Sequence, residues 1–269
     1  EDSNDDGIPD NFAALENNNT AEHFSGSALL TPLNILPSGG ATGTLSVPSV
    51  LFSDEGKVNV GINYDEVGTI SIAAQSTYLS DTTVQGLVQN VGRFAPSNFA
   101  LSGSVEAACN VNGAFNYFDQ PISEVSFSLT ALNQNGSRTT NYYDGFDKLI
   151  NISLQVEHGT SLLNRLENIN SISWPQNTSA GLISFSDNDI VFSRLADNSV
   201  DGPYLEAHIA LVADQAQIEG ANFNGLSCSG QCVDDFGDSI SFAYGRATLI
   251  NNYGAADEAL LLPLRTQYW

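Results

Sequence analysis

The chain has 269 residues, and its 42% of hydrophobic residues is enough to build one large domain or two modest ones. It carries 31 acidic residues against 8 lysines and arginines, a formal net charge of −23, and such a field repels nucleic acids and anionic membranes. We therefore expect no nucleic-acid partner. Only 14% of the residues are charged, and a polar surface made mostly of Asn, Ser, Thr and Gln favours an extracellular β protein over a cytosolic helical enzyme.

The chain opens with an acidic loop, EDSNDDGIPDNF, that has the spacing of a calcium site. Oxygen-bearing side chains alternate around a glycine at the position where calcium loops turn sharply. The D-G-I-P-D pattern resembles thrombospondin type 3 repeats and related bacterial calcium-binding linkers. We predict a Ca²⁺ ion, the one cofactor expected here, bound by Asp2, Asn4, Asp6, the carbonyl of Ile8, and Asp10.

One position of this loop departs from the calcium pattern. Ala13 stands where a bidentate acid is expected, so Glu16, water or a neighbouring module would have to complete the site. The alternative is an acidic terminus that is simply solvated. In the calcium interpretation the ion stiffens a linker and has no catalytic role.

Strict alternation of apolar and polar residues follows in the stretches 57–64, 125–131, 150–157 and 205–211. This period of two is typical of strands with one buried face. Gly, Asn and Asp separate the stretches, as in NQNGS at 133–137. The predicted fold is all-β, one or two immunoglobulin-like β-sandwich domains behind the short calcium loop. Helical spacing is scarce, and the best case is one short amphipathic turn or two at Leu162, Leu163, Leu166 and Ile169.

Residues 1–40 are rich in Asp, Asn, Gly and Pro, which predicts a loop. The alternation begins at about residue 42 and is interrupted at QNVGRFAPSNF, residues 89–99. The predicted organisation is a calcium-loop linker at 1–40, a small sandwich-like module at 41–95 and a larger sandwich domain at 96–269.

The sequence carries none of the usual motifs of catalysis, so we do not expect an enzyme. His23, His158 and His208 lack partners at metal-ligand spacing, and there is no HExxH, GxSxG or phosphate-binding loop. Asp234 and Asp235 could in principle serve glycoside hydrolysis, but adjacent residues of a strand point to opposite faces. The other acidic clusters, at 187–189 and 197–201, are typical of turns.

Three cysteines are present, at positions 109, 228 and 232. Cys228 and Cys232 could close a local disulfide in an oxidising compartment, and Cys109 pairing with one of them is the alternative. Exposed aromatic residues could stack on sugars. Of the two tryptophans, Trp174 and Trp269, Trp174 lies beside Pro175 near a predicted turn and is the better exposed candidate.

Two motifs resemble the C-terminal region of the MshQ family, large surface proteins of the MSHA type IV pilus system. They are VGRFAPSNFAL at 91–101 and FAYGRATLINNYGAADEALLLPLRTQYW at 242–269, and the intervening TTNYYDGFDKL at 139–149 also fits. The resemblance covers roughly residues 45–269. It implies a secreted, pilus-associated, adhesin-like protein, and the family supplies no catalytic residues to carry over.

We therefore expect a non-catalytic extracellular module, at the cell surface or on a pilus, that serves attachment or spaces binding domains. Its expected partners are other pilus or adhesin modules, with surface glycans and further copies of the chain kept open. The alternative is a filament subunit that assembles by strand donation, with the terminal segment 1–40 as donor. A secreted glycan hydrolase or its sugar-binding appendage is the third and least favoured possibility.

Overall fold

The computed structural model describes residues 21, 24–53, 56–78, 82–110, 113–176, 181–197, 199, 201–214, 222–224, 228 and 231–268. Across these residues the protein is all-β, with strands joined by turns and irregular segments and with no helix, as the alternating sequence predicts. Accordingly, none of the described segments is a long apolar helix of the kind that crosses a bilayer. The predicted calcium ligands, Asp2 to Asp10, lie outside the described residues.

The chain folds into two compact units, each assembled from separate stretches of sequence. The first comprises Glu1–Phe99, Ala131–Lys148 and Trp174–Leu182, and the second comprises Ala100–Thr130, Leu149–Ser173 and Ile183–Trp269. This division describes which parts of the chain pack together, and it does not test which stretches of sequence fold independently. The proposed modules at 41–95 and 96–269 therefore stay a prediction.

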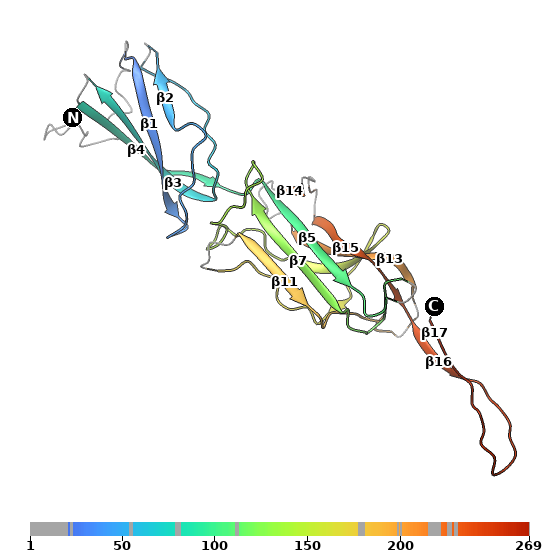
Figure 1. Cartoon of the computed structure of the whole chain (residues 1–269). Coiled ribbons are helices and arrows are strands. Elements are labelled where there is room, and N and C mark those ends of the chain that lie inside the picture. The colour runs from blue at the N-terminus through green and yellow to red at the C-terminus, as the bar shows by residue number, and fades with distance from the viewer. Residues whose placement is uncertain are drawn as a thin grey trace. The chain divides into compact units, whose positions relative to one another are not determined.

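The first unit contains a four-stranded antiparallel sheet in the order β2-β1-β3-β4 (Figure 1). Its strands are β1 (Gly26–Leu36), β2 (Ser49–Phe52), β3 (Gly68–Tyr78) and β4 (Thr82–Phe94). Residues from the segment between β1 and β2 and from the segment between β2 and β3 pack on one face of this sheet. Leu45 and Tyr64 from the flanking loops pack there on Ile70 and Ile72 of β3, and this cluster fixes the loops that form the candidate site.

The second unit is built mainly from two larger sheets. One has the order β11-β7-β5-β14 and the other β6-β15-β13-β8-β9. The strands of the first are β5 (Asn98–Glu106), β7 (Glu124–Leu132), β11 (Leu182–Asp187) and β14 (Asn222–Phe223). The strands of the second are β6 (Phe115–Tyr117), β8 (Ser153–His158), β9 (Ser161–Leu163), β13 (Tyr204–Asp214) and β15 (Gln231–Ala243).

These two sheets face each other as a β-sandwich, the predicted architecture. Along β7 every second residue is buried, including Val125, Phe127 and Leu129, because alternate side chains of a strand point to one face. Phe127 contacts Phe236 of β15 across the interior, with ring centroids 5.3 Å apart. The core therefore lies between the sheets, where apolar burial stabilises both.

Two short ribbons complete the second unit. The first pairs β10 (Leu166–Glu167) with β12 (Val191–Phe192), and the second pairs β16 (Gly245–Leu249) with β17 (Leu264–Tyr268). In the part of the chain that the structure describes, β16 and β17 pair only with each other. This β16–β17 ribbon extends from the end of β15 (Figure 1).

Three local predictions are wrong. Residues 26–36, predicted as loop, form β1, a central strand with partners on both sides. Residues 57–63 alternate in sequence but form no strand, because Ile62 and Tyr64 reach the core from an irregular segment. In place of a helical turn, Leu162 and Leu163 lie in β9 and Leu166 lies in β10, while Ile169 lies in the irregular segment that follows. Pairing with β8 and β12 overrides the weak helical spacing.

Candidate functional site

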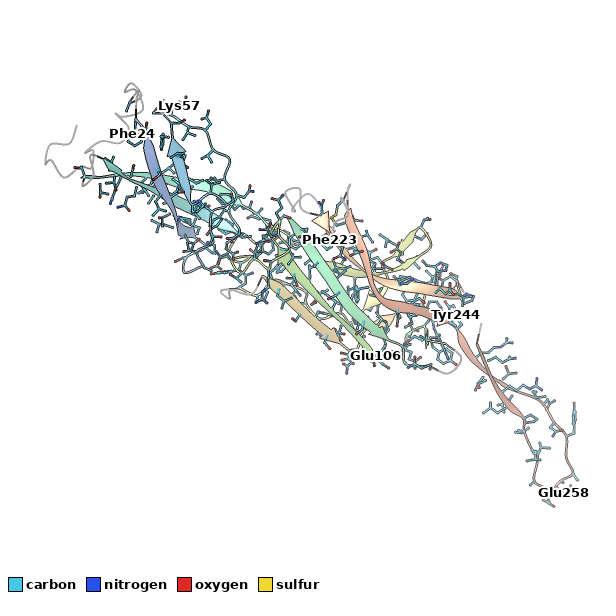
Figure 2. All side chains as sticks on the ribbon, turned by 45° about the horizontal axis from the view of Figure 1, so that its top comes forward. Phe24, Lys57, Glu106, Phe223, Tyr244 and Glu258 are labelled. Atoms are coloured by element: carbon cyan, nitrogen blue, oxygen red, sulfur yellow. A yellow bond between two sulfur atoms is a disulfide. The ribbon has the colours of Figure 1, made fainter. Side chains whose placement is uncertain are left out.

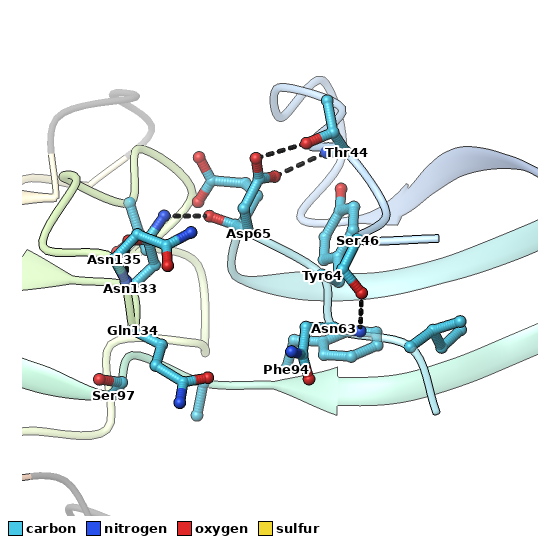
Figure 3. A pocket seen from close by; sticks show the side chains of 14 residues that line it. Thr44, Ser46, Asn63, Tyr64, Asp65, Phe94, Ser97, Asn133, Gln134 and Asn135 are labelled. Carbon is cyan, nitrogen blue, oxygen red and sulfur yellow. Dashed lines mark hydrogen bonds between the residues drawn. The ribbon is translucent and has the colours of Figure 1, made fainter. Parts of the chain in front are cut away.

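The candidate site is a polar pocket of about 360 Å³ in the first unit. Three stretches of sequence line it: the loops before β3, the end of β4 with the residues that follow, and the turn after β7. Figure 3 shows its lining residues, Thr44, Ser46, Ile62, Asn63, Tyr64, Asp65, Glu66, Phe94, Ala95, Ser97, Asn133, Gln134, Asn135 and Thr139.

Glu66 ties two of these stretches together. One oxygen of its carboxylate accepts hydrogen bonds from the backbone N–H groups of Val67 (2.8 Å) and Asn141 (3.1 Å). The other accepts from the N–H (2.9 Å) and the hydroxyl (3.0 Å) of Thr140. All four bonds hold protein groups, so Glu66 serves to position the loops.

Asn141, fully buried beside Glu66, extends this network to a third segment. Its Oδ1 accepts from the N–H of Ala41 at 2.8 Å, and its Nδ2 donates to the carbonyls of Ala41 (2.7 Å) and Val67 (3.0 Å). A buried amide stabilises a fold when its donors and acceptor are all satisfied, as they are here.

Asp65 anchors the opposite wall. Its two carboxylate oxygens accept from the N–H and the hydroxyl of Thr44, both at 2.6 Å, and its backbone carbonyl accepts from Nδ2 of Asn133 at 2.9 Å (Figure 3). Asn133 in turn accepts from the N–H groups of Asn135 and Ser137 through Oδ1. This closes the turn that NQNGS predicts from its sequence.

An aromatic pair supplies the apolar part of the pocket. The rings of Tyr64 and Phe94 lie 5.0 Å apart, and the Tyr64 hydroxyl accepts from the N–H of Gly43 at 2.7 Å. Burial raises the pKa of the Tyr64 phenol; the hydrogen bond from Gly43 opposes this shift, and nearby Glu66 and Asp65 add to it. The phenol therefore stays neutral at physiological pH.

The exposed rim of the pocket is made of neutral polar side chains. Asn63, Gln134 and Asn135 are exposed amides, and Ser46 and Ser97 are exposed hydroxyls. Since both carboxylates hold loops, the rim offers uncharged hydrogen-bond donors and acceptors beside a partly exposed aromatic ring. That chemistry suits a neutral ligand rich in hydroxyl groups.

A second polar cluster lies in the second unit around Arg165. Its guanidinium contacts Asp201, with Nη2 2.7 Å from Oδ2, and stacks over the ring of Phe192 at 4.5 Å. Tyr204 and Tyr244 also donate hydroxyl hydrogen bonds to Asp201. Partial burial acts to raise the pKa of Asp201, but the hydrogen bonds from Tyr204, Arg165 and Tyr244 and the charge of Arg165 outweigh it, so the pKa is lowered. Sequence reasoning placed Asp201 in a turn and missed this network.

The acids considered for hydrolysis do not converge. Asp234 accepts from Nδ2 of Asn224, whereas Oδ2 of Asp235 lies 3.2 Å from Nδ1 of His208. Burial raises the pKa of Asp234, with Asn224 opposing the shift and Asp235 adding to it. The two carboxylates thus meet different neighbours, and within the described residues no group of three or more His, Cys, Asp or Glu side chains could hold a metal.

Trp174 is buried, and its prediction as an exposed sugar platform is wrong. Its side chain is only 3% exposed and packs against Phe99 and Tyr142, with ring centroids 5.8 and 4.7 Å away. Trp269 lies outside the described residues. The partly exposed aromatic ring of the pocket is that of Phe94, which the sequence motif GRF contains but does not mark as a binding residue.

The cysteines have the arrangement of a local disulfide. The sulfur atoms of Cys228 and Cys232 lie 2.01 Å apart, and their Cα atoms are 5.0 Å apart. Cys109 is a free, half-buried thiol. This geometry fits the local pairing and not the alternative through Cys109.

The fold and the pocket define the class: an all-β sandwich protein whose pocket acids hold its loops in place. The chain belongs to the DUF6701 family, since residues 66–239, well over half of the chain, match the model described as DUF6701, third domain. A search of curated proteins finds no match. A search of solved structures likewise finds none.

Proposed function

We propose that this chain is a non-catalytic extracellular module of a pilus-associated, MshQ-like surface adhesin. The main support for the proposal is that the two acids of the pocket, Asp65 and Glu66, are hydrogen-bonded to protein groups. Asp65 and Glu66 are each occupied by hydrogen bonds from protein groups, so neither is poised to act as acid, base or nucleophile. What remains on the rim is suited to holding a neutral ligand.

The proposed ligand is a surface glycan, and the proposed location is the cell surface or a pilus. A net charge of −23 disfavours anionic partners, whereas neutral sugar hydroxyls can bond to the amides of Asn63, Gln134 and Asn135. The disulfide at Cys228 and Cys232 supports an oxidising compartment outside the cell. The motifs at 91–101 and 242–269 support the pilus association.

A glycan array with the purified chain tests this proposal. We expect binding to a subset of neutral glycans. The double variant Asn63→Ala, Gln134→Ala should weaken this binding about thirtyfold, because each of the two lost hydrogen bonds is worth about 1 kcal/mol. Asn164→Ala, which removes an exposed amide of the second unit, is the matched control and should bind like the wild type.

Two results would contradict the proposal. Equal binding by the rim variant and the control would remove the pocket from the interaction. Release of reducing sugar from the bound glycans would show an enzyme.

The alternative function is a filament subunit that assembles by strand donation. The donor expected for it, segment 1–40, includes β1, which pairs with β2 and β3 of its own chain. β1 is therefore not free to be donated. Contact between copies is better supported by two other surfaces, the exposed faces of the first-unit sheet and of the β16–β17 ribbon.

A further inference from the structure

The β16–β17 ribbon is amphipathic. Cross-strand partners share a face, so Leu249 with Leu264 and Ala247 with Thr266 form one side. The intervening pairs, Arg246 with Gln267 and Thr248 with Arg265, form the other. An apolar side alternating with a polar side is typical of a strand that packs against a core.

Among the described residues, none covers the apolar side of the ribbon. Leu249 is 67% exposed and Leu264 is 62% exposed, and the loop between the strands adds Tyr253 and Leu261, which are 88% and 84% exposed. Figure 2 shows the side chains of this ribbon, with Glu258 labelled in its loop. An isolated two-stranded sheet is marginally stable in water, so a cover for this side would stabilise it.

A matching surface lies on the sheet of the first unit. The face opposite its core carries four exposed leucines, Leu29, Leu33, Leu51 and Leu87, and we call it the leucine face. The register places them together, because Leu87 pairs with Ala73, which pairs with Thr31 between Leu29 and Leu33. Leu51 of β2 extends the face beside Ser27.

The leucine face is hollowed at its centre. A depression of about 390 Å³ is lined by small and medium residues, Thr31, Ala73, Ala74, Gln75, Gln85, Gly86 and Leu87. Leucines stand around a floor of alanine and glycine. Such a surface accepts large apolar side chains from a partner in the way that protein interiors interdigitate.

The charges on these two surfaces allow a second copy of this chain to be the partner. Copies that each carry a net charge of −23 repel wherever acids meet. Strands β1 to β4 contain a single charged residue, Arg93, and the ribbon strands contain Arg246 and Arg265 and no acid. The leucine face and the ribbon strands can therefore meet without acid–acid repulsion, and the acids Asp257 and Glu258 lie in the loop between β16 and β17.

We propose that the apolar side of the ribbon in one copy covers the leucine face of another copy. The two surfaces are different, so the contact is heterologous. The resulting pair keeps one free ribbon and one free leucine face, so the association continues as rings or open head-to-tail chains. This contact is independent of the polar pocket, so glycan binding can fail while self-association holds.

The first test is the mass of the full chain measured by light scattering over a range of concentrations. We expect the mass to rise with concentration from the monomer value of 28.6 kDa. A ribbon variant, Leu249→Asp with Leu264→Asp, and a face variant, Leu29→Asp with Leu87→Asp, should each weaken association at least tenfold. Thr248→Asp places one negative charge on the polar side of the ribbon and should associate like the wild type.

Mixing the two variants tests the heterologous geometry. The ribbon variant keeps an intact leucine face and the face variant keeps an intact ribbon, so their mixture should form a dimer of twice 28.6 kDa and stop there. A wild type that stays monomeric, a mixture that stays monomeric, or a Thr248→Asp variant as defective as the ribbon variant would each overturn the proposal. Versions of both variants with serine in place of aspartate serve as a second test, in case the aspartate variants misfold. Their circular dichroism should match that of the wild type, and they should also associate more weakly.

Discussion

At the scale of single residues, Glu66 does the most for the pocket, because its carboxylate accepts four hydrogen bonds from three residues. Glu66→Gln replaces one accepting oxygen by a donor and leaves protein donors unpaired. We expect a loss of about 2 kcal/mol in the free energy of unfolding, measured with urea. The control Glu258→Gln, at an exposed loop position, should change it by less than about 0.5 kcal/mol. Equal effects would mean that the network does not stabilise the fold.

The carboxyl group of Asp201 makes the free energy of unfolding depend on pH. Its folded pKa is lowered by its hydrogen bonds to Tyr204, Arg165 and Tyr244, so the ionised form stabilises the protein above the ordinary Asp value of about 3.9. That stabilisation disappears as pH falls through the lower folded pKa. Asp201→Asn should cost about 2 kcal/mol at pH 7.

Urea unfolding of wild type and Asp201→Asn between pH 7 and pH 2.5 checks this dependence. The difference between their free energies of unfolding should shrink below about pH 4 as the wild-type carboxyl is protonated. A difference that is constant across the range would show that Asp201 acts by packing and not by its charge.

The sequence alone predicts few of the residues that line the pocket, because most of them come together from distant parts of the chain. Asp65 and Glu66 are an unremarkable acidic pair until the fold brings Thr44, Thr140 and Asn141 to them, and a sequence separation of 75 residues leaves no local pattern. Only the turn at 133–137 was predicted, because its Asn and Gly residues act locally.

At the scale of elements, alternation predicted strands where one face meets a core. β7 follows that rule, since Val125 lies at a position buried between the sheets. β13 follows it only in part, because Leu205 is 59% exposed and the residues from Ile209 to Ala213 are all buried. It failed for residues 57–63, which form no strand: Ile62 packs on the core, whereas Val58 and Val60 are 41% and 43% exposed. It also missed β1, because Pro32 and adjacent leucines break the pattern, although pairing with β2 and β3 still holds the strand.

The contact between the two sandwich sheets depends on Gly103 of β5. A Cβ at this position would lie 2.5 Å from the carbonyl oxygen of Ser126 and 2.6 Å from the ring of Phe236. Gly103→Ala should therefore destabilise the protein by about 1–3 kcal/mol in thermal or urea unfolding, the usual cost of overpacking.

Gly61→Ala is the matched control for this change. A Cβ there would meet nothing within 4 Å, and Gly61 does not have a positive φ. We expect a change of less than about 1 kcal/mol. If both variants unfold alike, close packing of the sheets at Gly103 does not limit stability.

At the scale of the whole molecule, a net charge of −23 sets the energetic background. Self-repulsion destabilises the compact chain, and salt screens it over a Debye length of about 10 Å at 0.1 M. Any cation therefore raises stability to some degree. A specific calcium site must show an effect beyond this general screening.

The acidic loop predicts such an effect. With Ca²⁺ bound by Asp2, Asn4, Asp6, Ile8 and Asp10, the ion should raise the melting temperature, because saturation at 100 times Kd is worth about 2.7 kcal/mol. Sodium chloride at equal ionic strength supplies the same screening without a divalent ion, so it should raise the melting temperature far less. Asp6→Ala removes one predicted ligand and should abolish the calcium-specific part while leaving the salt response intact. If calcium and sodium act equally at matched ionic strength, the loop is a solvated acidic segment.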